Sequence, residues 1–570
     1  LVRVYRAALA DARDMSFIDR GLEHFGVRYE VSDADRARIP VDGPLVVVAN
    51  HPFGGVEGMI LASVLRRVRP EAKLLANYLL GRAPEMREYL IMVNPFGSAQ
   101  ARDANLAPMK QALRHLRDGG ALGVFPAGAV AHLCMKRRAV VDPPWSPTIA
   151  ALIRRSRATV LPVYFEGRNG AAFQLLGKLH PFMRTALLPR ELINKRGTTV
   201  RLRIGKPIAY DKLKSYDTDE ELTGHLRLRT ELLADRTDIV AAPASIVPPT
   251  SEAGGFEPIV SAVDTATLQR ELAALPADQT LVHSEPYRVV YFKAAQAPGM
   301  VEEIGRLREI TFRAVGEGTG RATDIDRFDA DYLHLVIWNE KRDELVGAYR
   351  MGPTDLIVRD RGIGGLYTST LFHYRRSLIE QIDPALELGR SFVRAEYQRS
   401  FSALMLLWKG IGQYVVRNPQ YKHLIGPVSI NNNYLSISRQ LIIRFLMQNR
   451  YLSRLGKLLK PRNPPRRMKT RAFAYSDDVR VVSSVEEVSD LIADLERDHN
   501  GVPILLRQYL RMGAKLLAFN IDPDFGDVLD GLMLADLTEC DTRVLDKYMG
   551  RAGRESFLAY HRIEPAVAGA

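Results

Sequence analysis

The chain has 570 residues, of which 46% are hydrophobic and 25% are charged. This composition excludes a disordered chain, and the length predicts two or three domains with separate cores. The net charge is +13, and residues 1–250 carry +12 of it. A basic surface attracts nucleic acid, anionic membrane or acidic protein, and charge alone does not choose among them.

Cysteine content and hydropathy further limit the kind of protein that this sequence can encode. The two cysteines, Cys134 and Cys540, lie far apart, which argues against a disulfide framework and a cysteine zinc site and fits a reducing compartment. The sequence has no run of about 18 uncharged apolar residues, so no transmembrane helix is expected. Residues 1–13 lack a signal-peptide core. We therefore expect a cytoplasmic protein.

A linker divides the chain near residue 250. Residues 241–260 read AAPASIVPPTSEAGGFEPIV and have neither helical nor strand periodicity. We place a first domain at 1–245, a linker at 246–275 and a second domain at 276–570.

Apolar runs in the first domain alternate with amphipathic helical runs, which predicts α/β layers. The expected strands are residues 45–49, 121–125, 159–165 and 200–204. In the second domain, residues 333–338 and 345–350 read as a hairpin, which favours an α+β fold.

A histidine lies on a glycine-rich turn in residues 50–58, which read NHPFGGVEG. The turn follows a buried strand and precedes a helix, so His51 is expected to face a cleft. Glu57, on the next turn, can fix the imidazole tautomer and support the imidazolium. A general base that deprotonates a hydroxyl needs this arrangement. The alternative is a structural turn with a capping glutamate.

Three further segments follow in order. The first is Asn94-Pro95-Phe96-Gly97-Ser98, with Arg102 soon after. The second is Phe125-Pro126-Ala127-Gly128, a turn after a strand that is suited to present backbone N–H groups to an oxyanion. The third is Glu166-Gly167-Arg168, at the end of another strand.

The four segments together resemble the lysophospholipid acyltransferase superfamily, and more closely its hemolysin-like and ornithine-lipid branch. The resemblance implies a glycerolipid-acyltransferase-like α/β domain in which His51 is the base and Glu57 its orienting partner. It also implies an acyl thioester donor. The implied substrate-binding residues are Arg102, Phe125, Pro126, Gly128, Glu166 and Arg168.

Two departures from that family bear on the acceptor. The histidine block is His51-x5-Glu57 where the family has His-x4-Asp, and Ala127 stands where the family has a glutamate. In the family this third block helps to hold a glycerol phosphate. Its loss suits an acceptor without that group.

The second domain carries an ordered set of charged residues. Residues 308–312 read REITF on an expected helix, aspartates follow at 324, 326, 329 and 331, and residues 387–390 read ELGR. The spacing does not fit an EF-hand, and we expect no metal.

This set resembles the autoinducer-synthase-like branch of the GNAT fold, which includes N-acyltransferases that use ornithine and acyl carrier protein. The resemblance covers residues 280–540. The implied substrate-binding residues are Arg308, Phe312, Asp326, Arg350 and Arg390.

An amine must be neutral to attack a thioester, so a carboxylate that accepts its proton is required. Glu387 is the first candidate for this base and Asp329 the second. Arg350 and Arg390 either hold an amino-acid carboxylate or pair internally with Glu387 or an aspartate.

A basic stretch runs from Arg444 to Arg471, with ten Lys and Arg and no acidic residue. Leucines at helical spacing predict a basic amphipathic helix that binds a membrane surface. Docking of an acidic acyl carrier protein and a core helix with a basic solvated face are the alternatives. No nucleic-acid-binding motif accompanies the charge, so we expect no nucleic-acid partner.

Both halves together resemble the bifunctional ornithine lipid synthases. The resemblance implies that the second domain N-acylates ornithine with a 3-hydroxyacyl group from acyl carrier protein, and that the first domain O-acylates the resulting lyso-lipid. Acyl thioesters are then the donors, no cofactor is expected, and the protein is peripheral on the cytoplasmic face of the inner membrane.

Three other functions stay open. One is N-acylation of glycine or another amino acid. Another is a 1-acylglycerol-3-phosphate acyltransferase with a non-catalytic GNAT-like domain. The third is a non-enzymatic scaffold or a protein that lyses bilayers.

Overall fold

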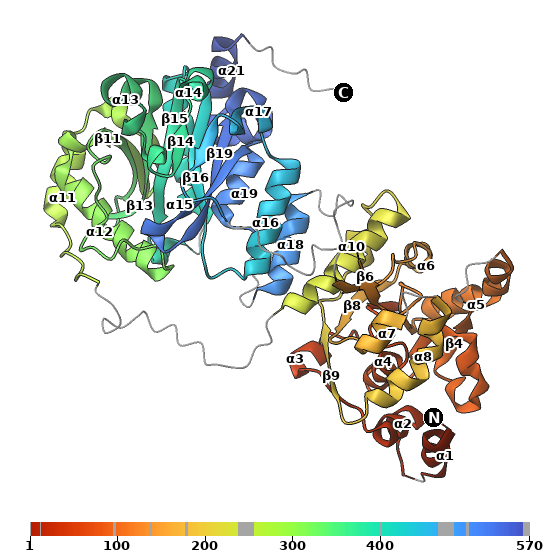
Figure 1. The fold of residues 1–570 in the computed structure, drawn as a ribbon. Helices are drawn as coiled ribbons and strands as arrows, with labels where there is room; N and C mark the ends of the chain where they lie inside the picture. Colours follow the sequence, from red (N-terminus) through yellow and green to blue (C-terminus); the bar gives the residue numbers. More distant parts are fainter. Residues whose placement is uncertain are drawn as a thin grey trace. The chain divides into compact units, whose positions relative to one another are not determined.

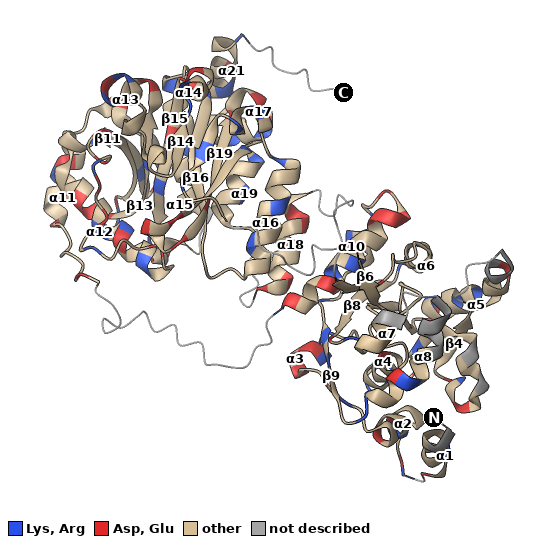
Figure 2. Ribbon diagram, viewed as in Figure 1, with Lys and Arg blue, Asp and Glu red and all other residues tan. Residues whose placement is uncertain are grey.

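The computed structural model describes residues 2–11, 13–94, 99–135, 139–176, 181–236, 256–398, 401–465, 484–496 and 501–562. These described residues form two compact units, one of those that fall within 1–239 and the other of those that fall within 240–468 and 484–570. Each is described by itself (Figure 1). Acidic and basic residues occur on both units (Figure 2).

The first unit is built on a seven-stranded sheet with the order β1-β9-β8-β2-β5-β3-β4. Its pairs are parallel except for β8 with β9, which are antiparallel. The strands are β1 (Arg28–Glu30), β2 (Leu45–Ala49), β3 (Lys73–Asn77), β4 (Leu90–Val93), β5 (Ala121–Val124), β8 (Thr159–Phe165) and β9 (Thr199–Ile204). A separate hairpin joins β6 (His132–Cys134) and β7 (Ala139–Val141).

Helices cover both faces of this sheet because both faces of β2 are apolar and fully buried. Leu45, Val47 and Ala49 pack in the core formed with α2 (Phe17–Phe25) and α4 (Val56–Arg66). Val46 and Val48 pack in the opposite core. That core is formed with α5 (Ala99–Arg117), α6 (Thr148–Ser156) and α10 (Asp219–Leu232). The unit is thus the expected α/β layer structure.

The remaining helices of this unit are α1 (Val2–Ala10), α3 (Asp33–Arg36), α7 (Ala171–Leu176), α8 (Pro181–Asn194) and α9 (Tyr210–Leu213).

The second unit is built on an eight-stranded sheet with the order β10-β11-β12-β13-β15-β16-β19-β18. Its pairs are antiparallel except for β15 with β16, which are parallel. The strands are β10 (Thr280–Ser284), β11 (Tyr287–Lys293), β12 (Leu333–Asn339), β13 (Glu344–Pro353), β15 (Ala385–Val393), β16 (His423–Ile430), β18 (Lys515–Asp522) and β19 (Val528–Asp536). The expected hairpin of β12 and β13 and the α+β class are confirmed.

Helices α11 (Thr265–Ala274) and α12 (Pro298–Ala314) pack on β11, β12 and β13 in one apolar core. The predicted linker of 246–275 contains α11, but Leu268 and Leu272 are buried in this core. The second unit therefore begins before residue 276, and residues 246–255 lie outside the described residues.

The other elements of this unit are α13 (Thr354–Arg361), β14 (Phe372–Tyr374), α14 (Arg376–Ile382), α15 (Phe401–Arg417), α16 (Ser436–Asn449), α17 (Ser453–Gly456), β17 (Leu459–Pro461), α18 (Val485–Leu495), α19 (Ile504–Arg511), α20 (Thr542–Met549) and α21 (Arg551–Tyr560). The strands β14 and β17 pair with each other.

The basic stretch is not one amphipathic helix. It falls on the end of α16, on α17 and on β17, and residues 466–471 lie outside the described residues. Four of its leucines pack in a core with β16, β18 and β19. They are Leu452, Leu455, Leu458 and Leu459. The apolar side chains that the sequence assigned to a membrane face are therefore part of the protein core.

Candidate active sites

His51 and Glu57 come together at the carboxyl end of β2. Nδ1 of His51 lies 2.9 Å from Oε1 of Glu57, at an angle outside regular hydrogen-bond geometry. Glu57 is fully buried in the first turn of α4. Its carboxylate accepts three backbone N–H groups at 2.7–2.9 Å, from Phe53, Gly54 and Gly55. The N-terminal end of a helix stabilises a negative charge in this way.

The pair shifts the pKa values of both groups. Burial lowers the pKa of His51, but the carboxylates of Glu57 and Asp142 outweigh burial and raise it above its usual value. Burial raises the pKa of Glu57, but His51 and the backbone N–H groups outweigh it and lower that pKa. An ionised Glu57 in this position can stabilise an imidazolium at His51, which is what a general base requires.

Asp142 is a residue of this site that the sequence analysis missed. Its two carboxylate oxygens each lie 3.2 Å from the backbone N of His51, and Oδ2 also accepts the Trp145 indole N–H at 3.2 Å. It is buried, and burial raises its pKa. An Asp-Pro-Pro sequence after a short apolar run was the available signal, and it indicates a turn rather than a site.

Side chains from neighbouring strands fix the histidine turn. The amide of Asn50 exchanges two hydrogen bonds with the backbone of Phe165, at 2.7 and 3.0 Å, and so ties β2 to β8. The ring of Phe125 lies 4.7 Å from the His51 ring, centroid to centroid. The His51 side chain is 18% exposed, so solvent reaches it at the carboxyl end of β2.

The turn after β5 is closed by its own backbone. The N–H of Gly128 donates to the carbonyl of Phe125 at 3.0 Å, and the carbonyl of Pro126 accepts the N–H of Ser146 at 2.9 Å. One of the backbone N–H groups that this turn was expected to present to an oxyanion, that of Gly128, is thus engaged within the turn.

Three other residues of the first unit were predicted to bind substrate, and the structure places each of them as follows. Glu166 forms an ion pair with Arg203 of β9 at 2.5 Å. Arg168 is exposed, and its carbonyl accepts from Lys195 at 2.8 Å. Arg102 lies in α5, and its side chain is outside the described residues.

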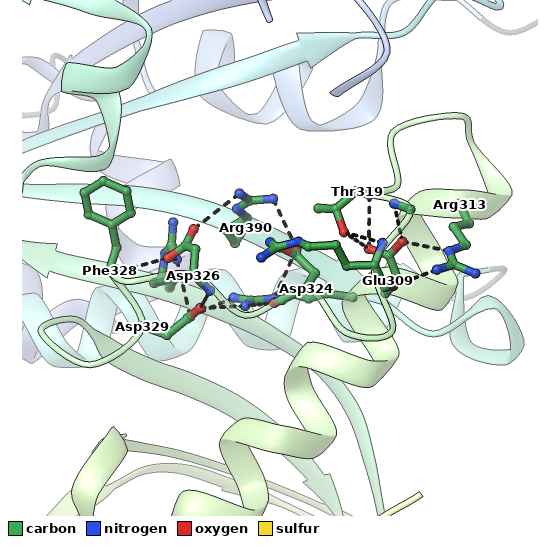
Figure 3. Close-up of polar contacts among 12 residues, drawn as sticks. Glu309, Arg313, Thr319, Asp324, Asp326, Phe328, Asp329 and Arg390 are labelled. Atoms are coloured by element: carbon green, nitrogen blue, oxygen red, sulfur yellow. Dashed lines mark hydrogen bonds and ion pairs between the residues drawn. The ribbon is translucent and has the colours of Figure 1, made fainter. Parts of the chain in front are cut away.

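In the second unit, three arginines and three aspartates form a buried network (Figure 3). Arg308 of α12 holds Asp329 with two hydrogen bonds of 2.9 and 3.0 Å and also donates to the carbonyl of Asp324. The Arg308 side chain is 1% exposed. Burial raises the pKa of Asp329, but Arg308 and Arg350 outweigh burial and lower it. A carboxylate of low pKa is a weak proton acceptor.

The other two arginines complete the network from adjacent strands. Arg350 of β13 donates to Asp326 at 2.7 Å. Arg390 of β15 donates to Asp324 at 3.1 Å and to Asp326 at 3.3 Å. These arginines therefore pair internally with aspartates, one of the two arrangements left open by the sequence.

The network is electrically balanced, yet it keeps hydrogen-bonding capacity. Arg350 Nε, Arg350 Nη2 and Arg390 Nε are buried and find no hydrogen-bond partner among the described residues. Buried donors are seldom left unpaired. These N–H groups fit the carboxylate of a bound amino acid.

Glu387 is 2% exposed and has several donors around it. It accepts from the Tyr332 hydroxyl and from two backbone N–H groups, those of Tyr367 at 3.2 Å and Thr368 at 2.8 Å. These contacts tie β15 to the segment at residues 367–370. They occupy much of the hydrogen-bonding capacity of the Glu387 carboxylate, which a base needs in order to contact an amine.

Space opens next to Glu387. Strands β15 and β16 pair over only three residues of each strand, 385–387 with 423–425. A methyl group added at Gly389, just beyond this paired part, would meet no atom within 4 Å. The position lies between Glu387 and Arg390 and is partly exposed. Phe312, another predicted residue, packs against Phe525 at 6.3 Å between ring centroids.

No group of His, Cys, Asp and Glu suited to a metal ion occurs among the described residues. In that part of the chain, no helix has both the length and the apolar character needed to cross a bilayer.

Two protein families match the chain. Residues 5–240 match a family described as acyltransferase, and residues 307–409 match the acetyltransferase (GNAT) domain. The expected pairing of an acyltransferase domain with a C-terminal GNAT domain is therefore confirmed.

Similar proteins occur in Phocaeicola vulgatus and Bacteroides thetaiotaomicron. A glycine N(alpha)-acyltransferase of Phocaeicola vulgatus is 31% identical over 49% of this chain and 89% of its own length. The Bacteroides thetaiotaomicron protein of the same name is 32% identical over 42% of this chain and 74% of its own length. A lyso-glycine lipid O-acyltransferase of Phocaeicola vulgatus is 27% identical over 35% of this chain and 72% of its own length.

Proposed function

The chain belongs to the glycine N(alpha)-acyltransferase family, and from this premise we propose that it makes an amino-acid lipid in two steps. The second unit N-acylates an amino acid, and the first unit O-acylates the product. The observation that carries the proposal is the presence, in one chain, of two domains that match acyltransferase families. The relatives are named for an N-acylation and an O-acylation.

The O-acylation step is supported by the His51–Glu57 pair. Neutral His51 takes the proton of the acceptor hydroxyl as the oxygen attacks the thioester carbonyl, and the buried Glu57 carboxylate stabilises the imidazolium. Ala127, in place of the glutamate expected for a glycerol phosphate, favours an acceptor without phosphate. A 3-hydroxyacyl amino acid is such an acceptor.

The N-acylation step is supported by the buried arginine network. Its unpaired N–H groups suit an amino-acid carboxylate, and the open space at Gly389 lies beside them. The acyl donor is proposed to be a thioester of acyl carrier protein, with a 3-hydroxyacyl chain for this step.

The amino acid is proposed as glycine or ornithine. The relatives' names favour glycine. Ornithine carries a second amine that needs a negative partner, and the buried aspartates of the network already pair with arginines. We propose a peripheral location on the cytoplasmic face of the inner membrane, because a lyso-lipid intermediate partitions into the bilayer.

Lipid mass spectrometry in a bacterium that lacks amino-acid lipids tests the proposal. Wild type should give a diacylated amino-acid lipid, and the fragment mass names the amino acid. His51→Ala should accumulate the mono-acylated form. His24→Ala, a partly exposed histidine of α2, is the matched control and should behave as wild type.

Gly389→Leu should abolish both lipids, because the new side chain fills the space beside Arg390. Gly364→Leu is its control, since that position is also open and is exposed at the surface. The absence of any amino-acid lipid in a host that supplies 3-hydroxyacyl carrier protein would contradict the proposal. A changed phospholipid profile would instead support a lysophospholipid acyltransferase.

A further inference from the structure

Three more carboxyl groups of the second unit lie close to the arginine network. Asp530 lies in β19, where the register pairs it with Ser429 of β16 on one side and Asn520 of β18 on the other. Asp522 is two residues beyond Asn520. Because paired residues share a face and side chains alternate along a strand, Asp522 and Asp530 project from the same face of the sheet.

That face is the one that carries the network. The parallel pairing of β15 with β16 puts Glu387 on the same face as Ile425, and Ser429 is four residues further along β16. Ser429 donates to Asp530 at 2.7 Å. Arg350 lies on this face as well, since it pairs with Gly389, two residues from Glu387.

The third carboxyl, Glu317, comes from the loop after α12. The neighbouring Gly316 carbonyl approaches Gly526 so closely that a Cβ there would lie 2.6 Å from it. Gly526 follows the short turn that begins at Asp522. Glu317 and Asp522 interact electrostatically. We call Glu317, Asp522 and Asp530 the carboxyl triad.

Arg390 connects the triad to the site already described. Its guanidinium lies 4.1 Å from the ring centroid of Phe525, and it interacts electrostatically with Asp522 and Asp530. Its side chain is 7% exposed, and its Nε is the unpaired donor noted above. A nearly buried cation with a free N–H at the edge of the triad indicates a polar ligand here. The open position at Gly389 gives that ligand room.

Burial raises the pKa of all three carboxyl groups of the triad, and two of these pKa values lie near neutral pH. Burial raises the pKa of Asp530 to about 7, with a further increase from Asp522 and Glu317, while Ser429 and Arg390 lower it. Burial and Asp522 raise the pKa of Glu317 to about 7. Tyr367 also interacts electrostatically with Asp530. A carboxyl group with this pKa can take up a proton and release it again near neutral pH. Asp329 cannot do this as readily, because its pKa is lowered.

We infer that Asp530, supported by Asp522 and Glu317, is the base that takes the proton of the amino-acid amine during N-acylation. The inference rests on the proposed function and replaces Glu387 and Asp329 in this role. Arg350 and Arg390 hold the carboxylate of the amino acid, and its ammonium group lies toward the triad.

The reaction balances as follows. The ammonium group gives one proton to the Asp530 carboxylate, directly or through one water, and becomes a neutral amine. Its nitrogen attacks the thioester carbonyl, the C–N bond forms, and the C–S bond breaks. The nitrogen loses its second proton and the leaving thiolate gains one. The proton on Asp530 then passes to solvent, so each turnover yields an amide, a thiol and one proton.

The rate of thiol release by the full chain, measured from pH 5.5 to 9, tests this inference. The donor is a 3-hydroxyacyl thioester of acyl carrier protein, and glycine and ornithine are the acceptors. For wild type, kcat/KM should rise through an ionisation near pH 7. Asp530→Asn keeps the shape and the hydrogen bond of Ser429, and should lower kcat/KM about 10²-fold or more and remove this ionisation.

Ser429→Ala removes a hydrogen bond that lowers the pKa of Asp530, and should move the ionisation to higher pH. Glu302→Gln, which changes an exposed carboxyl of α12 outside the triad, should stay within about twofold of wild type at each pH. O-acylation of a supplied lyso-lipid should be unchanged in all three variants, which shows that the first unit is folded and active, and urea denaturation followed in the second unit should show that this unit is folded as well.

Retention of the ionisation in Asp530→Asn, or an unmoved ionisation in Ser429→Ala, would overturn the inference and leave the proposed function intact. Wild type that N-acylates neither amino acid, nor any other, would overturn the proposed function and this inference with it.

Discussion

Glu57 lies 2.9 Å from the imidazole of His51 and is itself held by the backbone N–H groups of the turn that carries the histidine. One carboxylate thus shapes the turn and sets the proton affinity of the base. A glutamine at this position would keep a hydrogen-bond acceptor for the turn but lose the negative charge. The substitution Glu57→Gln therefore separates the electrostatic contribution of Glu57 from its structural contribution.

Glu57→Gln should reduce O-acylation about 10²-fold or more, since an uncompensated imidazolium is left in the transition state. The pH-rate profile should also move. His51 must be neutral to act, so activity rises with pH through its pKa, which Glu57 holds above the usual value. Without that carboxylate the rise should occur at lower pH. Kinetics of lyso-lipid acylation across pH 5–9 measures both effects.

Asp142→Asn serves as the comparison for that variant. Asp142 also raises the pKa of His51 but acts by charge alone, whereas Glu57 acts by charge and by direct contact. The shift to lower pH should therefore have the same sign and be smaller. A larger shift than that of Glu57→Gln would contradict this assignment.

The buried Arg308–Asp329 pair gives a prediction about stability. Asp329→Ala leaves a buried guanidinium without its bidentate partner and should destabilise the second unit by about 3–5 kcal/mol. Arg308→Met should cost a similar amount. The double variant should cost clearly less than the sum, because no unpaired charge remains. Urea denaturation followed in the second unit measures these free energies, and additive costs would contradict the pairing.

The strand, turn and helix around His51 were predictable from sequence because the apolar strand, the glycines and Glu57 lie within a few residues of each other. Asp142 was not, since it is 91 residues from His51 and reaches it only through the fold. Asp530 was missed for a similar reason. Its place beside Arg390 depends on the register of β16, β18 and β19, which local periodicity does not specify.

The basic stretch shows the opposite error. The spacing of its leucines indicated a helix with a membrane-facing side, but a buried core produces the same spacing. Apolar periodicity indicates that one face of a segment is buried, but it does not distinguish burial in the protein core from burial in a membrane.

Glu387 and Tyr332 give a prediction that separates positioning from proton transfer. If Glu387 positions the segment at residues 367–370, then Tyr332→Phe and Glu387→Gln should both weaken N-acylation and combine less than additively, since they break one contact. Each should keep the ionisation near pH 7 that we assign to Asp530. Loss of that ionisation in Glu387→Gln alone would return the role of base to Glu387. Steady-state kinetics of both variants and of the double variant distinguishes these outcomes.

The basic stretch still exposes charge, and this gives a prediction about the membrane. Its leucines pack in or against the core, but four of its basic side chains are exposed, namely Arg454, Lys457, Lys460 and Arg462. Basic residues near an anionic bilayer contribute about 1 kcal/mol each to binding, and salt screens the attraction. Changing all four to glutamine should therefore weaken binding to vesicles that contain anionic lipid, most strongly at low salt.

The matched control changes four exposed basic residues elsewhere in the second unit to glutamine, namely Arg270, Lys293, Lys341 and Arg342. It removes the same charge and should retain most of the binding if the basic stretch is the contact surface. Vesicle co-sedimentation at two salt concentrations compares the variants. Equal losses in both would mean that net charge, rather than this surface, determines binding. If binding persists in the first variant while N-acylation from acyl carrier protein is impaired, the stretch serves the carrier protein, because an acidic donor protein needs the same charges without a bilayer.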